Sequence, residues 1–303
     1  MKEELSTQTL EGISMSTYVF GDIHGCFDTF QALLKKIQWN PKHDKIWCVG
    51  DVINRGPKSL AMIEWILDHQ DHVQCILGNH EIHLLACYAG ASFSFGDTID
   101  ECLDSPKVDE IVTWMRKQPL LYQEGSHAMV HAGISPLWSW QEACHKAKSL
   151  ESILQSDDGL SSLAHFHPSR KKAKLAKVVE SYEYLPEWVK DLGWFTRVRT
   201  LNNQYQMNEK FKGSLDNADQ NSQPWFNEYQ QRVKNSKGFP STLFFGHWAA
   251  LGIYVGDSVY SLDSGCIWGR ALSAIRIEDH QLFQQKTIDR ALVPKNKRKS
   301  SVP

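Results

Sequence analysis

The sequence has 303 residues, of which 42% are hydrophobic and 22% are charged, and its formal net charge at pH 7 is -2. This composition is ordinary for a globular protein, and the length suffices for one large core or two small ones. The near-neutral charge gives no global indication of binding to nucleic acids or membrane surfaces. No apolar run approaches the ~18 residues of a membrane span, and the polar start does not resemble a signal peptide. We therefore expect a soluble, cytoplasmic protein.

The two ends of the chain differ from the rest. We expect residues 1–15 to be a disordered extension, residues 16–290 to form a single domain, and residues 291–303 to be a basic flexible tail. Seven cysteines are scattered without a CxxC pair, and several lie in apolar runs. This usage is typical of small buried side chains in a reducing compartment.

Three apolar strands, each followed by a helical pattern, occupy the first third of the chain. The strand segments are 17–25, 45–57 and 72–81. The helical segments are 27–38, 58–69 and 81–89. Strands that alternate with helices indicate parallel βαβ units, and the strands are apolar enough to be covered on both faces. In such sheets, ligands bind at the carboxyl ends of the strands.

The pattern changes after a fourth apolar strand at 127–135. Residues from about 136 to about 240 are more polar and predict a mostly helical cap insertion. Within it, helical runs are expected near 140–155 and 169–183, with a loop-rich segment near 202–223. Strand patterns then return at 241–248, 258–266 and 271–279. This order predicts a mixed α/β (α+β) fold, with two mixed β-sheets flanked by helices.

Polar side chains follow these strands at the ends where ligands bind. They are Asp22, His24, Asp51, Asn79, His80, His131 and His247. Taken singly, each could be a helix cap, a turn residue or a core histidine, but five such clusters favour a shared site. Imidazole, carboxylate and amide groups together suit divalent first-row metals better than Ca²⁺, and two carboxylates allow one to bridge. Two ions ~3.5–4 Å apart can clamp both oxygens of an in-line displacement at phosphorus.

Five motifs in this order, GDIHG, GDVINRG, GNHE, HAG and GHW, resemble the signatures of the phosphoprotein-phosphatase branch of the metallophosphoesterases. That resemblance implies the calcineurin-like fold. The segments GNHEIHLLA, HAGISPLWS, FTRVRT, FFGHWAALG and YSLDSGCIWGRALSAIRIED are similar to the family of bacterial symmetrical bis(5'-nucleosyl)-tetraphosphatases, over about residues 17–284. The family resemblance implies hydrolysis of diadenosine 5',5'''-P1,P4-tetraphosphate, and of related dinucleoside polyphosphates, to two ADP by one-step attack of a metal-bound hydroxide.

The resemblance also implies roles for individual residues. One metal ion is assigned to Asp22 and His24, Asp51 bridges, and the second ion is assigned to Asn79, His131 and His247. The two divalent ions are expected to be Mn or Co, with Fe or Zn also compatible. The remaining matches are His80 as general acid, Arg55 as a phosphate-binding arginine, and Arg197 as a weaker match to a second one, with Arg199 as its rival.

One position departs from the protein serine/threonine phosphatases of the same fold. Those enzymes have an aspartate three residues after the bridging aspartate, where this sequence has Asn54. An amide cannot stabilise an imidazolium as a carboxylate does. A serine alkoxide needs a strong proton donor, whereas ADP leaves as a phosphate whose second pKa is about 6. Asn54 therefore favours anhydride hydrolysis over phosphoserine hydrolysis.

Several alternatives stay open at this stage. The bases of a dinucleotide need aromatic platforms, and one or two are expected among Trp138, Trp140, Trp194, Phe195, Trp225, Phe226, Trp248 and Trp268. The same anhydride chemistry could remove dinucleotide-type caps from RNA 5' ends. The alternative functions are a serine/threonine protein phosphatase of the same fold and a metal-binding regulator without turnover. No membrane partner is expected, and the oligomeric state is left open.

Overall fold

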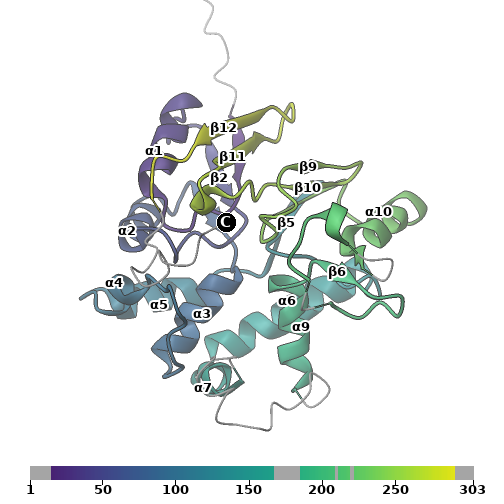
Figure 1. Ribbon diagram of the computed structural model, residues 1–303, viewed down its shortest axis with the longest axis horizontal. Coiled ribbons are helices and arrows are strands. Elements are labelled where there is room, and N and C mark those ends of the chain that lie inside the picture. Colours follow the sequence, from purple (N-terminus) through teal and green to yellow (C-terminus); the bar gives the residue numbers. More distant parts are fainter. Residues whose placement is uncertain (1–14, 167–184, 209–210, 219–221, 291–303) are drawn as a thin grey trace, which may run out of the picture.

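The computed structural model describes residues 15–166, 185–208, 211–218 and 222–290. Three predicted segments lie outside the described residues: the basic tail, the helix at 169–183, and the N-terminal extension except for its last residue, Met15. Within the described part, two five-stranded mixed β-sheets form the centre, and helices lie around them (Figure 1). This arrangement confirms the predicted mixed fold.

The first sheet has the strand order β12-β11-β1-β2-β3. Its strands are β1 (Thr17–Phe20), β2 (Lys45–Cys48), β3 (Val73–Cys75), β11 (Ala271–Arg276) and β12 (Leu282–Lys286). β1 pairs in parallel with β2, and β2 with β3, through the crossover helices α1 (Phe27–Lys36) and α2 (Ser59–Asp68). The predicted βαβ units are therefore confirmed. β11 runs antiparallel to β1, so the last part of the described chain lies beside the first.

The second sheet has the order β4-β5-β8-β10-β9. Its strands are β4 (Leu121–Glu124), β5 (His127–Val130), β8 (Thr242–Phe245), β9 (Tyr254–Val255) and β10 (Val259–Ser261). β5, β8 and β10 are parallel, whereas β4 and β9 pair antiparallel at the two edges. The sequence pattern did not reveal β4, β9 or β12, because these edge strands are short or expose alternate residues.

An apolar layer separates the two sheets. Val19 of β1 and Trp47 of β2 point into this layer, where Met129 of β5 and Phe244 of β8 meet them. Because side chains alternate along a strand, Phe20 points the other way, into the larger core that also contains the helices. All four residues of β1 are buried as a result, which explains why the three after Thr17 are all hydrophobic.

The chain segment that connects β3 to β4 forms three helices, α3 (Asn79–Tyr88), α4 (Asp100–Leu103) and α5 (Val108–Arg116). α3 confirms the third predicted helix, and it begins two residues earlier than expected, at the GNHE motif. α4 and α5 were not predicted.

In the described part of the chain, no helix combines the length and the apolar character needed to span a membrane.

The segment predicted as a cap contains most of the remaining helices. They are α6 (Trp140–Gln155), α7 (Asp157–Phe166), α9 (Glu187–Thr196) and α10 (Trp225–Asn235). Between α9 and α10, the chain forms β6 (Thr200–Leu201), the 3₁₀ turn η2 (Leu215–Asn217) and β7 (Gln223–Pro224). α6 has the predicted bounds because Ser139 and Glu142 form a reciprocal cap at its start. Figure 1 shows α6, α7 and α9 gathered on the side of the molecule away from β11 and β12. The division into one domain with an insertion stays a prediction.

Candidate active site

The predicted ligands lie on loops at the carboxyl ends of strands, or at the start of the next helix. In chain order, they are Asp22 and His24 after β1, Asp51 after β2, Asn79 and His80 after β3, His131 after β5 and His247 after β8. Because β1, β2 and β3 are parallel in one sheet and β5 and β8 in the other, the loops converge where both sets of strands end. The structure therefore places these residues at the carboxyl ends of the parallel strands, where ligands commonly bind.

The backbone is left-handed at five residues of these loops. Their φ angles are 53° at His24, 51° at Asp51, 72° at Asn54, 74° at Arg55 and 66° at His247. Only eight non-glycine residues in the described ranges have positive φ, so most of them lie here. L-residues rarely adopt this conformation, and such strain concentrates at functional sites where the surrounding structure enforces it.

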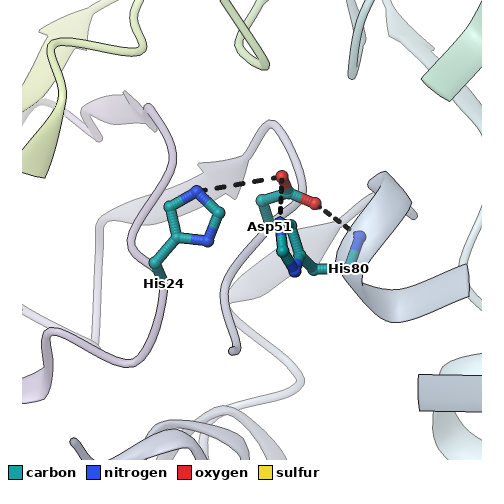
Figure 2. A group of neighbouring side chains, drawn as sticks. All are labelled: His24, Asp51 and His80. Atoms are coloured by element: carbon teal, nitrogen blue, oxygen red, sulfur yellow. Dashed lines mark hydrogen bonds and ion pairs between the residues drawn. The ribbon is translucent and has the colours of Figure 1, made fainter. Parts of the chain in front are cut away.

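Asp51 is at the centre of the site. Its Oδ2 atom lies 3.9 Å from Nε2 of His24, 3.9 Å from Nε2 of His80 and 3.3 Å from Nε2 of His131. Figure 2 shows the rings of His24 and His80 beside the same carboxylate, and their centroids are 4.8 Å apart. Asp51 thus belongs to two groups of donor atoms that lie within 4.8 Å of one another, one with His24 and His80, the other with His131 and His247. A carboxylate shared in this way is suited to bridge two ions.

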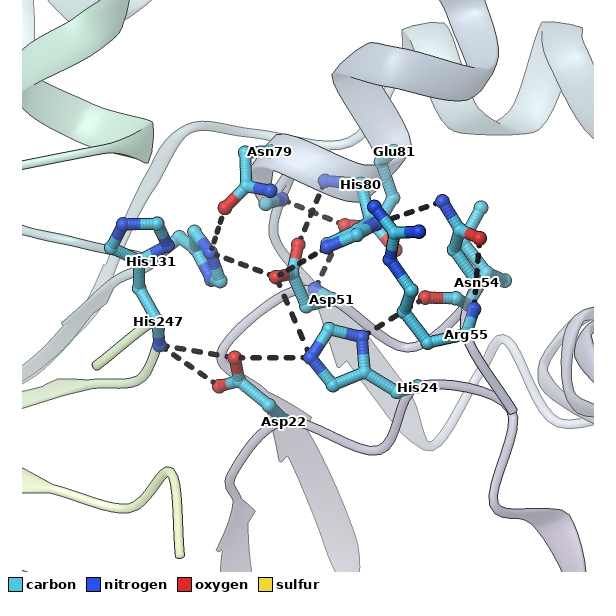
Figure 3. A network of polar contacts seen from close by, with 12 residues as sticks. Asp22, His24, Asp51, Asn54, Arg55, Asn79, His80, Glu81, His131 and His247 are labelled. Carbon is cyan, nitrogen blue, oxygen red and sulfur yellow. Dashed lines mark hydrogen bonds and ion pairs between the residues drawn. The ribbon is translucent and has the colours of Figure 1, made fainter. Parts of the chain in front are cut away.

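Asp22 and Asn79 complete the predicted ligand set (Figure 3). Oδ2 of Asp22 lies 3.8 Å from Nε2 of His24, and the two carboxylate oxygens accept the N–H of His247, each at 3.1 Å. Oδ1 of Asn79 lies 3.3 Å from Nε2 of His131. The structure therefore brings together all six residues that were predicted to bind metal, although they come from separate loops.

Three of the histidines have one ring nitrogen engaged by a backbone carbonyl. Nδ1 of His24 lies 3.3 Å from the carbonyl oxygen of Ile53. Nδ1 of His131 lies 2.7 Å from the carbonyl oxygen of Val49, so Nδ1 carries a hydrogen and Nε2 is the ring nitrogen that faces Asp51. Nε2 of His247 lies 3.1 Å from the carbonyl oxygen of Arg197, which leaves the lone pair on Nδ1. Histidines that bind metals are commonly oriented by such a hydrogen bond from the opposite ring nitrogen.

The charge balance of the cluster also suits cations. Asp22 and Asp51 are 3% and 2% exposed. Burial, together with the carboxylates of Asp263 and Asp51, raises the pKa of Asp22 well above its usual value. Burial acts in the same direction on Asp51, but the neighbouring histidines outweigh it and lower that pKa. Divalent ions would stabilise both carboxylates in their charged form, so these residues fit a pair of metal ions.

The orientation of His80 is set by Asn54. Oδ1 of Asn54 accepts the N–H groups of Arg55 at 2.8 Å and Thr98 at 2.9 Å, so the opposite atom is the amide nitrogen. This nitrogen lies 2.9 Å from Nδ1 of His80, which must accept. The hydrogen of the neutral ring is then on Nε2, which faces the ligand cluster. Burial lowers the pKa of His80 to about 3, which keeps the ring neutral.

Glu81 has a structural role at the site that was not predicted. Its carboxylate accepts the N–H groups of Gly78 at 2.9 Å, Asp51 at 2.8 Å and Val52 at 3.0 Å. Glu81 is 2% exposed, and it ties the loop after β2 to the start of α3. From the sequence it reads as an ordinary glutamate in a first helical turn, because no local pattern shows that the carboxylate reaches another strand.

Two further aspartates at the site were also missed. Asp97 accepts from the Asn54 amide at 3.1 Å and lies 2.6 Å from Nε2 of His83. Burial would raise the pKa of Asp97, but these contacts outweigh burial and lower it to about 2. Asp263 follows β10 and is 3% exposed, and burial raises its pKa. The pattern that located Asp22, an apolar strand followed by aspartate and glycine, could have found Asp263, whereas no motif marks Asp97.

A cavity of about 350 Å³ opens onto the cluster. Arg199 lines this cavity, and its Nη2 donates to the carbonyl of His247 at 3.3 Å. Arg197 lines a different, small cavity and contributes its backbone carbonyl to His247. Arg55 lies beside His80 (Figure 3). The structure therefore brings Arg55 and Arg199 to the site, whereas the predicted role of Arg197 stays a prediction.

The fold and the site define a calcineurin-like phosphoesterase, and the sequence profile of that family matches residues 15–193. Solved structures with the same fold include one provisionally assigned as a diadenosine tetraphosphatase (TM-score 0.57, 18% identity, covering 91% of this chain and 95% of that one). Another is a protein serine/threonine phosphatase from Saccharomyces cerevisiae (TM-score 0.54, 14% identity, covering 90% of this chain and 80% of that one). At these identities the likeness shows the fold alone.

Proteins with similar sequences show which family of calcineurin-like phosphoesterases this chain belongs to. Two proteins named symmetrical bis(5'-nucleosyl)-tetraphosphatase are similar to this chain over most of their length. The one from Methylobacillus flagellatus is 37% identical over 274 residues, covering 89% of this chain and 95% of the relative. The one from Chromobacterium violaceum is 37% identical over 270 residues, covering 89% of this chain and 94% of the relative. The chain belongs to the family of these bis(5'-nucleosyl)-tetraphosphatases, as its motifs predicted.

Proposed function

We propose that this chain hydrolyses diadenosine tetraphosphate, and related dinucleoside polyphosphates, symmetrically to two ADP. The observation that carries the proposal is the position of Asp51 between two groups of metal-binding side chains, next to the Nε2–H of His80. The names of the relatives support the choice of substrate. The reaction is proposed to be a single in-line displacement, without a covalent intermediate on the chain.

The residues of the site have distinct parts in this reaction. Two divalent ions, proposed to be Mn or Co with Fe or Zn also compatible, would supply hydroxide at neutral pH and neutralise charge on the polyphosphate. His80 presents its Nε2–H, which can donate a hydrogen bond to an oxygen of the departing ADP. The guanidinium groups of Arg55 and Arg199 can hold the phosphate chain by charge-assisted hydrogen bonds.

Asn54 supports anhydride hydrolysis over phosphoserine hydrolysis. Its amide donates to Nδ1 of His80, so nothing on that side stabilises a protonated ring. A neutral N–H donor is sufficient for a phosphate leaving group but poorly suited to a serine alkoxide. The serine/threonine protein phosphatase is therefore the second choice, and removal of caps from RNA 5' ends stays a prediction.

The compartment is proposed from the cysteines. All seven lie in the described ranges, each is a free thiol, and six are buried, with Cys144 partly exposed. This confirms that most of them act as small buried side chains. Free thiols are typical of a reducing compartment, which supports a cytoplasmic location.

The proposed function is tested by product analysis. Purified protein is incubated with diadenosine tetraphosphate and Mn²⁺ or Co²⁺, and the products are separated by chromatography. ADP as the sole product, abolished by a chelator and by Asp51→Asn, is the expected result. Asp68→Asn at the end of α2 serves as the matched control, because it removes an exposed carboxylate far along the helix from the site.

Two outcomes would contradict the proposal. ATP and AMP as products would retain a phosphoesterase site but exclude symmetrical cleavage. Hydrolysis of a phosphoserine peptide, with no turnover of the dinucleotide, would favour the protein-phosphatase alternative and overturn the argument from Asn54.

A further inference from the structure

The rim of the cavity carries an aromatic side chain that the structure has left exposed. All eleven tryptophans of the chain lie in the described ranges, and only Trp268 is exposed, with 66% of its surface accessible. It lines the same cavity as His80 and Asp51. Of the eight aromatic residues considered from the sequence, the other seven are buried or partly buried. An exposed indole in the wall of this cavity offers an aromatic face on which a base can stack.

The turn that carries Trp268 has a defined backbone geometry. The 3₁₀ turn η3 (Cys266–Trp268) is flanked by Gly265 and Gly269, whose φ angles are 76° and 88°. Cys266 and Ile267 are 2% and 4% exposed, so the turn is anchored in the core immediately before Trp268. The two buried residues before Trp268 therefore fix where its indole leaves the core, beside the cavity.

Besides Arg199, two further cationic side chains, Arg270 and Lys212, line the same cavity as Trp268. Nη1 of Arg270 donates to the carbonyl of Ala249 at 3.1 Å. Lys212 is exposed, and the next residue, Gly213, accepts a hydrogen bond from Nε1 of Trp248 at 2.8 Å. Because Trp248 directly follows His247, this contact ties the lysine-bearing segment to the ligand loop. An aromatic face and two positive charges beside the candidate metal ligands match the chemistry of a nucleoside phosphate.

We propose that Trp268, Lys212 and Arg270 form the subsite for one nucleoside end of the substrate. The base stacks on the exposed indole of Trp268, while Lys212 and Arg270 hold the adjoining phosphates. This inference rests on the proposed function for its substrate, but the subsite makes its own prediction, namely that the chain binds ADP through the base as well as through the phosphates.

The test compares ADP with tripolyphosphate, which has the charge but no base. Both are titrated by calorimetry into the full-length protein in the presence of Mn²⁺. Stacking on an aromatic side chain is worth ~1–3 kcal/mol per base, so Trp268→Ala is expected to weaken ADP binding at least about fivefold. Tripolyphosphate affinity is expected to be unchanged in this variant, and Trp268→Phe is expected to retain most of the ADP affinity.

Separate variants test the loss of a positive charge and the loss of an exposed apolar side chain. Lys212→Gln is expected to weaken ADP and tripolyphosphate to a similar degree, because it removes a phosphate contact. Leu137→Ala, at an apolar residue that is 68% exposed and does not line the cavity, and Lys237→Gln, at an exposed lysine elsewhere, are expected to change neither. The thermal midpoint of each variant reports its folding.

Equal ADP affinity in the wild type and Trp268→Ala would overturn the subsite, and so would an equal loss for ADP and tripolyphosphate. Either result would leave the proposed function standing if the wild type still converts diadenosine tetraphosphate to ADP. Conversely, failure of the wild type to form ADP would overturn the proposed function, whatever the titrations show.

Discussion

At the scale of the residue, the contacts of Asn54 decide what His80 can do. The amide oxygen has two backbone donors, and the amide nitrogen is shared between His80 at 2.9 Å and Asp97 at 3.1 Å. Asparagine also tolerates the left-handed conformation at this position better than most residues do. A single side chain thus fixes the tautomer of the proposed hydrogen-bond donor.

We expect Asn54→Asp to lower the turnover of diadenosine tetraphosphate. The new carboxylate would face Asp97 at a distance near 3.1 Å, and the two negative charges would repel each other. Adding Asp97→Asn to this variant removes the repulsion and is expected to restore part of the activity. Steady-state kinetics with the dinucleotide and with a phosphoserine peptide measure the effect. A large gain in anhydride hydrolysis in Asn54→Asp would contradict the role given to the amide.

A second prediction concerns the two arginines that the sequence could not separate. Arg199 lines the cavity and Arg197 does not, so Arg199→Ala is expected to lower kcat/KM for the dinucleotide more than Arg197→Ala. A lost charge-assisted hydrogen bond is worth about 1.5–3 kcal/mol, which corresponds to at least a tenfold loss. The backbone carbonyl of Arg197 still holds His247 in the alanine variant. A larger loss for Arg197→Ala would return the phosphate-binding role to that residue.

At the scale of the element, close approaches of backbone hold the ligand loops together. A Cβ atom at Gly246, between β8 and His247, would lie 1.9 Å from Oδ1 of Asp22 and 2.8 Å from Cγ2 of Val49. The two sheets therefore meet at the site with no room for a side chain. This explains why the ligand His247 comes directly after a glycine.

We expect Gly246→Ala to weaken metal binding because the new methyl group must displace Asp22. Calorimetric titration with Mn²⁺ measures the affinity. Gly193→Ala in α9 is the matched control, since its Cβ would meet only the flexible end of Met207, at 3.1 Å from Cε. Equal Mn²⁺ affinity in Gly246→Ala and the wild type would show that metal binding does not depend on the present position of Asp22.

At the scale of the whole molecule, the buried carboxylates of Asp22 and Asp51 couple metal binding to folding. A ligand that binds only the folded state stabilises it by about 2.7 kcal/mol at 100 times its dissociation constant. Mn²⁺ is therefore expected to raise the thermal midpoint of the wild type, and to raise it less in Asp51→Asn. Differential scanning calorimetry at increasing Mn²⁺ concentration tests this. A midpoint independent of Mn²⁺ would contradict a metal site at this cluster.

The sequence by itself determined the fold class, the βαβ order and the residues of the cluster. Strands buried on both faces must be apolar runs, so polar residues next to glycine stand out at their ends, as at Asp22 and His247. The capped helix α6 was likewise predictable, because its start is encoded in neighbouring residues, Ser139 and Glu142.

Only the tertiary structure decided which residues act on one another across the molecule. Glu81, Asp97 and Asp263 gain their roles from partners on other loops, and the exposure of Trp268 follows from how η3 lies against the core. The physical reason is that burial, hydrogen-bond partners and cavity walls depend on segments distant in sequence, such as β1 and β11, being placed side by side. Local patterns record which side chains are available, whereas the packing of the two sheets determines which of them meet.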